Sequence, residues 1–152
     1  MMKQSGILLA GKKLVFLSIV LSIQSFASTE LKMNPNKIYI LDFFASWCPS
    51  CEKELPILSK LHPNLKKRGI ELVGIDVDTK SEDGKKFQEK MKKHLPFEVI
   101  NDTSNRIIAE YKPKGMPALI MVKNNIVCGK VFGAVANLEE KIEEQIKLCE
   151  EK

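Results

Sequence analysis

The chain has 152 residues, which fits a single domain, and its 24 basic and 19 acidic residues give a formal charge of +5. Lys3, Lys12 and Lys13 are the only charged residues before Glu30, and removing these three lysines lowers the charge to +2. A surface so evenly charged lacks the clustered basic excess that phosphate groups require, so we expect no nucleic-acid partner.

The N-terminal segment has the three parts of a secretory signal peptide. Basic residues precede an apolar run at residues 14–23, and the small-x-small sequence Ser25-Phe26-Ala27 follows it. We predict a signal peptide over residues 1–27, cleaved after Ala27, and export to the periplasm or another exported bacterial compartment. The alternative is a retained membrane anchor, but a span needs about 20 apolar residues, and Gly11-Lys12-Lys13 interrupts this one.

Residues 28–152 alternate between strand and helix patterns. The predicted elements, in chain order, are a buried strand at 37–44, a helix from about 48 to 69, a strand at 71–77, a helix opening with a capping box at 79–82, a strand at 97–100, a helix at about 104–111, strands at 118–122 and 126–132, and a helix capped by Asn137. Pro56 and Pro63 each remove a backbone donor, which predicts a kink or break in the first helix. Asn124-Asn125 predicts a tight antiparallel hairpin. The order predicts an α/β fold with a mixed sheet.

Cys48 and Cys51 form a Cys-x-x-Cys pair, which could be half of a metal site, a staple or a reactive pair. A structural zinc site needs four ligands, and neither the widely spaced Cys128 and Cys149 nor the two histidines supply a second close pair, so we expect no metal. Closing so short a loop removes little chain entropy, which disfavours a staple.

The position of the pair favours a reactive role. Cys48 lies where a strand turns into a helix, so its sulfur can face unpaired backbone N–H groups and the positive end of the helix dipole. Both stabilise a thiolate, which is the nucleophile in thiol–disulfide exchange. Cys51, one turn further, is placed to attack a mixed disulfide formed at Cys48.

The motifs resemble a known family over nearly all of residues 28–152. The sequence "ILDFFASWCPSC", "GMP" about 65 residues later and "VFGA" before a final helix resemble the thioredoxin fold. Within that fold, "WCPSCEKELP", "GIELVGIDVD" and "AEYKPKGMPALIMV" are similar to the TlpA/ResA/CcmG branch of exported thiol–disulfide oxidoreductases. The resemblance implies a central mixed sheet with helices on both faces, Cys48 as the exposed attacking cysteine, Cys51 as the resolving cysteine, and no cofactor besides their disulfide.

The resemblance also implies roles for residues around the pair. Pro117 matches the family's cis-proline beside the disulfide, and Met116 would offer its backbone to an extended substrate segment. Asp42 matches a buried acid that accepts the proton of the resolving cysteine, and burial would raise its pKa. An ordinary trans proline and a solvent-facing edge aspartate are the alternatives.

Three further positions match the family near the pair. Glu54 matches an acid whose charge influences proton transfer, whereas a solvent-facing helix glutamate is its alternative. Trp47 and Gly133 would line the substrate groove, whereas Trp47 could instead be a packing residue.

Cys128 and Cys149 are expected to be small buried hydrophobic residues, with Cys128 on the strand face shared by Ile126 and Phe132. A structural disulfide between them and a second redox pair are the alternatives.

The sequence therefore predicts a monomeric thiol–disulfide oxidoreductase that acts as a reductase. The resemblance implies protein clients with thiols or disulfides, such as the haem site of apocytochrome c, and a membrane electron donor of the DsbD or CcdA type. Pro49-Ser50 between the cysteines is equally typical of thiol oxidases, which leaves that direction as an alternative. A redox-inactive module that binds copper or a thiol-bearing protein is the alternative of another class.

Overall fold

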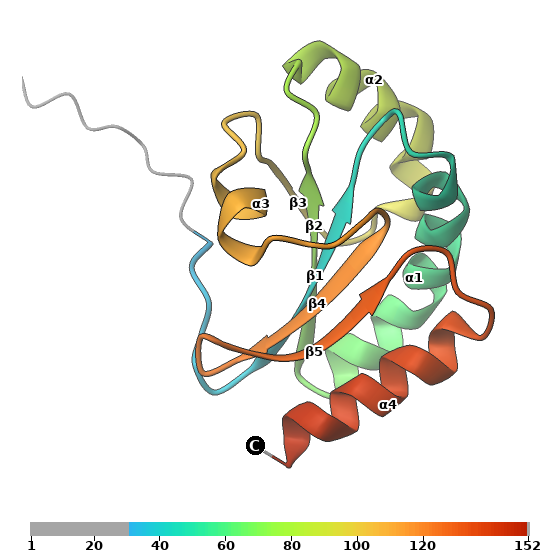
Figure 1. The fold of residues 1–152 in the computed structure, drawn as a ribbon. Coiled ribbons are helices and arrows are strands. Elements are labelled where there is room, and N and C mark those ends of the chain that lie inside the picture. Colours follow the sequence, from blue (N-terminus) through green and yellow to red (C-terminus); the bar gives the residue numbers. More distant parts are fainter. Residues whose placement is uncertain (1–30, 152) are drawn as a thin grey trace, which may run out of the picture.

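The computed structural model describes residues 31–151, so the predicted signal peptide and cleavage site lie outside the described residues. Five strands form one sheet in the order β3-β2-β1-β4-β5 (Figure 1). The strands are β1 (Ile38–Phe44), β2 (Ile70–Asp76), β3 (Glu98–Asn101), β4 (Ala118–Lys123) and β5 (Ile126–Phe132). The β1–β2 and β2–β3 pairs are parallel, whereas β4 is antiparallel to both β1 and β5. The predicted mixed sheet is confirmed.

Helices cover both faces of this sheet (Figure 1). They are α1 (Pro49–Lys67), α2 (Ser81–Met91), the short 3-10 helix η1 (Lys92–His94), α3 (Arg106–Tyr111) and α4 (Leu138–Glu150). Buried side chains of α1, α2 and α4 share one apolar cluster, while Ile107 of α3 belongs to the cluster on the opposite face. The prediction of helices on both faces is confirmed.

Strand β1 shows why the central strands are apolar along their whole length. Side chains alternate between faces, so Ile40 and Phe44 enter the α1/α4 cluster, while Leu41 and Phe43 enter the α3 cluster. Both faces are covered, and a polar side chain on either face is therefore buried. Asp42, on the α1/α4 face, is the exception in this strand, and it is 1% exposed.

Helix α1 is continuous across Pro56 and Pro63, so the prediction of a break is wrong. Each proline removes one backbone hydrogen bond, but Leu55, Leu58 and Leu65 anchor the helix in the core. Burial of that apolar face, about 1.5–3 kcal/mol for each side chain, outweighs the missing bonds. The helix ends at Lys67, and Gly69 follows at a φ of +74°, as its role as a stop requires.

The predicted helix caps differ from the observed ones. No side chain caps α2 at Lys80, and Asn137 takes a left-handed conformation without a capping bond to α4. At α3, by contrast, the Asp102 carboxylate accepts from the backbone N–H groups of Arg106 and Ile108. Capping from outside the helix depends on the path of the preceding loop, which sequence spacing does not reveal.

The hairpin between β4 and β5 is confirmed, with Asn124 and Asn125 at φ values of 52° and 60°. The pairing shifts at Met121/Val122, so Cys128 is an additional residue in β5. This bulge changes the alternation of faces along the strand. Cys128 therefore faces the α1/α4 cluster and Phe132 faces the α3 cluster, and the prediction that they share a face is wrong.

Within residues 31–151, no helix combines the length and apolar character needed to cross a bilayer.

Candidate active site

Cys48 directly precedes helix α1, in the loop that follows the carboxyl end of β1. It is the residue that caps the helix, with extended backbone angles, and Pro49 occupies the first helical position. The backbone N–H of Cys51 donates a hydrogen bond of 3.2 Å to Cys48 Sγ. The same N–H also donates to the Cys48 carbonyl oxygen at 3.1 Å, so the sulfur shares a donor of the first helical turn, at the positive end of the α1 dipole. In the reduced protein, the same contact stabilises a thiolate on Cys48.

Cys48 and Cys51 form a disulfide, with 5.3 Å between their Cα atoms. Cys48 is 6% exposed and Cys51 is 1% exposed, and both belong to the α1/α4 cluster. Cys48 is the more accessible of the two, but the prediction of an exposed cysteine is wrong for this disulfide form, because its side chain turns inward along α1 to reach Cys51.

Asp42 and Glu54 place two carboxyl groups in the layer between β1 and α1. Glu54 is 6% exposed, so neither acid faces solvent as the alternatives required. Among residues 31–151, Asp42 Oδ2 and Glu54 Oε1 have no hydrogen-bond partner. An unpaired buried carboxylate is costly, and these groups reduce the cost by binding protons.

Both carboxyl groups have raised pKa values. Burial raises the pKa of Glu54 from 4.5 to about 7. Burial, and secondly the nearby Glu54 charge, raise the pKa of Asp42 well above 3.8. Glu54 can therefore both take up and release a proton near neutral pH. Helix α1 carries Glu54 and Cys51 three residues apart, on the same buried side of the helix.

The segment before β4 lies at the same edge of the sheet. The Met116–Pro117 peptide bond is cis, and Pro117 is buried. Phe43 pairs with Ala118, so Pro117 lies next to the end of β1 that leads into Cys48. Met116, which is partly buried, packs against the cluster that contains both cysteines. The structure thus places this segment at the edge of the sheet where β1 leads into Cys48.

Gly133 contacts the Pro117 segment through its backbone, whereas the Trp47 side chain faces solvent. The backbone N–H of Gly133 donates to the carbonyl of Pro117 at 2.8 Å, and the φ of Gly133 is +74°. Gly133 therefore supports the Pro117 segment. Trp47 is 63% exposed, so it is not a packing residue.

A network that the sequence analysis missed holds the loop before Cys48. The Asp78 carboxylate accepts from both the backbone N–H and the hydroxyl of Ser46, each at 2.8 Å. The N–H of Asp78 donates to Asp76 Oδ1 at 2.9 Å, and the other Asp76 oxygen accepts from Gln88 at 2.6 Å. Asp76 and Asp78 are 1% and 5% exposed. In the sequence, the signal for this network is that Asp76 and Asp78 are spaced by one residue at the carboxyl end of a parallel strand.

A groove of about 450 Å³ opens beside Trp47, and its lining includes Ser46, Asp78, Lys80 and Ile108. It joins the loop before Cys48 to the ends of β2 and α3.

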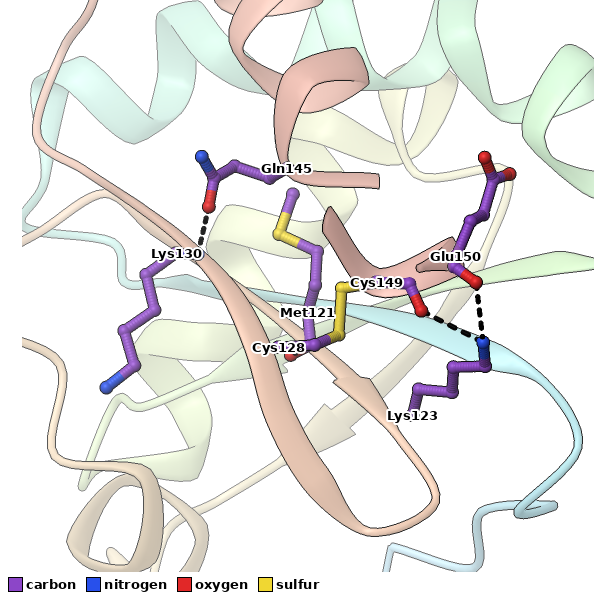
Figure 2. The surroundings of a disulfide bond; sticks show 7 residues. All are labelled: Met121, Lys123, Cys128, Lys130, Gln145, Cys149 and Glu150. Carbon is purple, nitrogen blue, oxygen red and sulfur yellow. Dashed lines mark hydrogen bonds between the residues drawn. A yellow bond between two sulfur atoms is a disulfide. The ribbon is translucent and has the colours of Figure 1, made fainter. Parts of the chain in front are cut away.

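Cys128 and Cys149 form a second disulfide between β5 and α4, with 5.1 Å between their Cα atoms (Figure 2). The prediction of two unpaired buried residues is therefore wrong. The β5 bulge turns Cys128 toward the helix layer, where Cys149 lies in the last turn of α4. All four cysteines in the described part of the chain are paired.

Within residues 31–151, no three His, Cys, Asp or Glu side chains are grouped to hold a metal ion. The buried polar chemistry near Cys48 and Cys51 consists of carboxyl groups suited to proton transfer.

Comparison with known proteins agrees with this architecture. A thiol-disulfide oxidoreductase ResA of Bacillus cereus is 32% identical over 105 residues, which cover 68% of this chain and 60% of the relative. The chain thus spans less than two thirds of that relative's length. A structure described as thiol:disulfide interchange protein DsbE from Chlorobium tepidum has a TM-score of 0.65 and 28% identity, covering 74% of this chain and 79% of its own.

The fold is confirmed as thioredoxin-like. A thioredoxin-like protein from Porphyromonas gingivalis has a TM-score of 0.61 at 21% identity, covering 78% of this chain and 79% of its own. The family model described as the AhpC/TSA family matches residues 16–131, which is most of the chain. On that match, and on the fold and relatives that agree with it, the chain belongs to the AhpC/TSA family.

Proposed function

We propose that this protein is a thiol–disulfide oxidoreductase that exchanges disulfides with client proteins through Cys48 and Cys51, and that it acts as a reductase. The observation that carries the proposal is the Cys48–Cys51 disulfide at the start of α1, where the Cys51 N–H bonds to Cys48 Sγ. The similarity to relatives named thiol-disulfide oxidoreductase ResA, which are 32% and 31% identical, supports it.

The first step belongs to Cys48. In the reduced protein, the Cys48 thiolate attacks one sulfur of a client disulfide, a Cys48–client bond forms, and the second client sulfur leaves as a thiolate that takes up a proton. In this proposal, the client segment binds along the exposed Trp47 and the backbone beside Pro117; the 63% exposure of Trp47 and the cis Met116–Pro117 bond support it.

The second step belongs to Cys51. Its thiol must lose a proton before its sulfur can attack Cys48 Sγ, and at 1% exposure it has little access to water. We assign Asp42 and Glu54 as the acceptors, because their raised pKa values suit a base near neutral pH. The Cys48–Cys51 bond forms, the client leaves as a dithiol, and two electrons have passed to the client.

The wider assignments remain those implied by the sequence resemblance. They are an exported location, client proteins of the apocytochrome c type, and a membrane electron donor that returns Cys48 and Cys51 to the dithiol. Each step needs only thiols and disulfides, so no cofactor is invoked.

The test is reduction of a protein disulfide, such as that of insulin, by catalytic amounts of this protein with dithiothreitol as the electron source. We expect turnover with the native chain and none above background with Cys48→Ser, while Cys51→Ser should accumulate a mixed disulfide with the client. A Cys48→Ser variant as active as the native protein would refute the proposal. A redox potential near the strongly oxidising limit of about −120 mV would instead identify a thiol oxidase.

A further inference from the structure

The second disulfide differs from the first in its place on a helix. Cys48 directly precedes α1, whereas Cys149 lies in the last turn of α4 and is bonded to Cys128 of β5 (Figure 2). Helix N-termini carry partial positive charge and stabilise thiolates, whereas C-termini carry partial negative charge and disfavour them. The first disulfide therefore lies where a thiolate is stabilised, and the second lies where a thiolate is destabilised.

The atoms around Cys128 act in the same direction. Cys128 Sγ lies 3.4 Å from the carbonyl oxygen of Met121. In the reduced protein, the Cys128 thiol can donate a hydrogen bond to that oxygen, whereas a Cys128 thiolate would be repelled by it. Cys48 Sγ instead accepts from a backbone N–H at 3.2 Å. A local donor stabilises the reduced form at Cys48, and a local acceptor destabilises a thiolate at Cys128.

Lys123 is a cation beside Cys149, and its ammonium group binds the backbone. Its Nζ donates to the carbonyl oxygens of Cys149 at 2.9 Å and Glu150 at 3.3 Å. Figure 2 shows the ammonium group on the carbonyl side of Cys149, with the two sulfurs on the other side. Lys123 therefore caps the end of α4 and holds it to β4, where it reinforces the contact that the disulfide makes.

Cys149 is 0% exposed and Cys128 is 8% exposed, so this pair is about as buried as Cys48 and Cys51. The two pairs differ instead in the open space beside them. The opening beside Cys128 is an apolar cavity of about 80 Å³ lined by Lys123, Asn124 and Ile126. Since a water molecule takes up about 30 Å³, this space admits very small molecules and excludes the extended segment of a protein client. The groove beside Trp47 is more than five times larger, at about 450 Å³.

We propose that Cys128–Cys149 is a permanent disulfide that stays closed while Cys48–Cys51 opens and closes. Because both thiolates of the second pair are disfavoured, its sulfurs are poor leaving groups, and its disulfide is harder to reduce than Cys48–Cys51. Electrons from a Cys128/Cys149 dithiol therefore pass to a Cys48–Cys51 disulfide. Two thiols become a disulfide, one disulfide becomes two thiols, and a small-molecule thiol carries the exchange without a further oxidant.

The test is a redox titration of the full chain with dithiothreitol at graded ratios of its reduced and oxidised forms. After acid quenching and alkylation, peptide mass analysis reports each cysteine pair separately. We expect Cys128 and Cys149 to require at least a tenfold higher ratio of reduced to oxidised dithiothreitol than Cys48 and Cys51. Coincident midpoints, or reduction of Cys128–Cys149 first, would overturn the proposal.

A second measurement starts from the fully reduced chain with two oxidising equivalents per molecule in a thiol buffer. At equilibrium, the single disulfide should be Cys128–Cys149, with Cys48 and Cys51 free. A population with mainly the Cys48–Cys51 disulfide contradicts the proposal.

Variants separate this proposal from the proposed function. The chain with Cys48→Ala and Cys51→Ala should keep the Cys128–Cys149 disulfide while exchange is lost. The chain with Cys128→Ala and Cys149→Ala should keep the Cys48–Cys51 midpoint within about threefold, since the two environments do not overlap. If that variant fails to fold, the titration of the native chain still decides. Loss of exchange by the native chain would defeat the proposed function and leave the permanent disulfide standing.

Discussion

At the scale of single residues, the site depends on acidic side chains that the fold buries away from water. Asp42 and Glu54 are buried without a full set of hydrogen bonds among the described residues, and both hold protons more tightly than free carboxyl groups do. The acids at Asp78 and Asp102 are equally buried but fully used, because each accepts two hydrogen bonds. Among these four acids, Asp78 and Asp102 accept hydrogen bonds, whereas Asp42 and Glu54 each have one oxygen without a partner.

The buried Glu54 predicts that stability falls as pH rises. The pKa of Glu54 is about 7 in the folded chain and near 4.5 in the unfolded chain, so the folded state binds more protons between these values. The free energy of unfolding should therefore decrease from pH 5 to pH 8, by on the order of 3 kcal/mol from this residue. The raised pKa of Asp42 acts with the same sign.

Urea unfolding of the disulfide form at both pH values checks this prediction. Glu54→Gln should flatten the pH dependence, whereas Glu139→Gln, at an exposed position of α4, should leave it unchanged. An unaltered pH slope in Glu54→Gln would show that another group causes the dependence.

The contact between Ser46 and Asp78 predicts a positioning role. Asp78→Asn leaves one oxygen for two Ser46 donors and turns an NH₂ group toward them, so we expect a loss of about 1.5–3 kcal/mol in unfolding free energy. Because the loop carries Cys48, client exchange should slow as well. Ser46→Ala removes only the hydroxyl bond and should have the smaller effect on both.

The measurement compares unfolding free energy with the alkylation rate of reduced Cys48 in the two variants. A purely structural role would lower stability and leave the alkylation rate of the folded protein unchanged. A positioning role changes both quantities.

At the scale of elements, the two ends of helices set the properties of the two disulfides. The start of α1 presents N–H groups to Cys48, and the end of α4 presents carbonyl groups near Cys149. Helix α4 is also held by Arg68, whose guanidinium donates to both carboxylate oxygens of Glu143 at 2.7 and 2.9 Å. The covalent bond therefore supplements packing and an ion pair at this helix.

Helix α2 packs on β2 through a glycine. A Cβ at Gly84 would lie 2.6 Å from Asp76 Oδ2, and that carboxylate is fixed by Gln88 and by the Asp78 N–H. We expect Gly84→Ala to destabilise the protein, because overpacking costs about 1–3 kcal/mol and the gain in helix propensity is at most about 1 kcal/mol.

Thermal or urea unfolding measures this effect. Gly115→Ala is the matched control, since a Cβ there meets nothing within 4 Å. A Gly84→Ala variant as stable as this control would show that α2 shifts freely on β2.

At the scale of the whole molecule, the Cys128–Cys149 bond links strand β5 to helix α4. The two cysteines are 21 residues apart, and a loop of this length predicts a stabilisation of about 3 kcal/mol through restriction of the unfolded chain. Replacing both with alanine should lower the unfolding free energy by about that amount, measured in urea. The shorter Cys48–Cys51 loop should contribute less, as suits a bond that opens in use.

The reactive pair and the elements around it could be predicted because their signals are local. Apolar runs mark β1, β2 and β4, leucines at helical spacing mark α1, and Asn124-Asn125 marks the hairpin. The Cys-x-x-Cys pair needs only the start of one helix to bring its sulfurs together. Local spacing decides each of these features, and sequence by itself determined them.

Only the tertiary structure decided which side chains from distant segments come into contact. The bulge in β5 turns Cys128 toward α4, and without it the pairing with Cys149 does not follow from strand alternation. Whether Asp42 and Glu54 are buried together depends on how α1 lies over β1, and whether Asp78 reaches Ser46 depends on the loops at the end of β2. Contacts across long chain separations arise from packing, and packing is a property of the folded sheet and its layers rather than of any one stretch of residues.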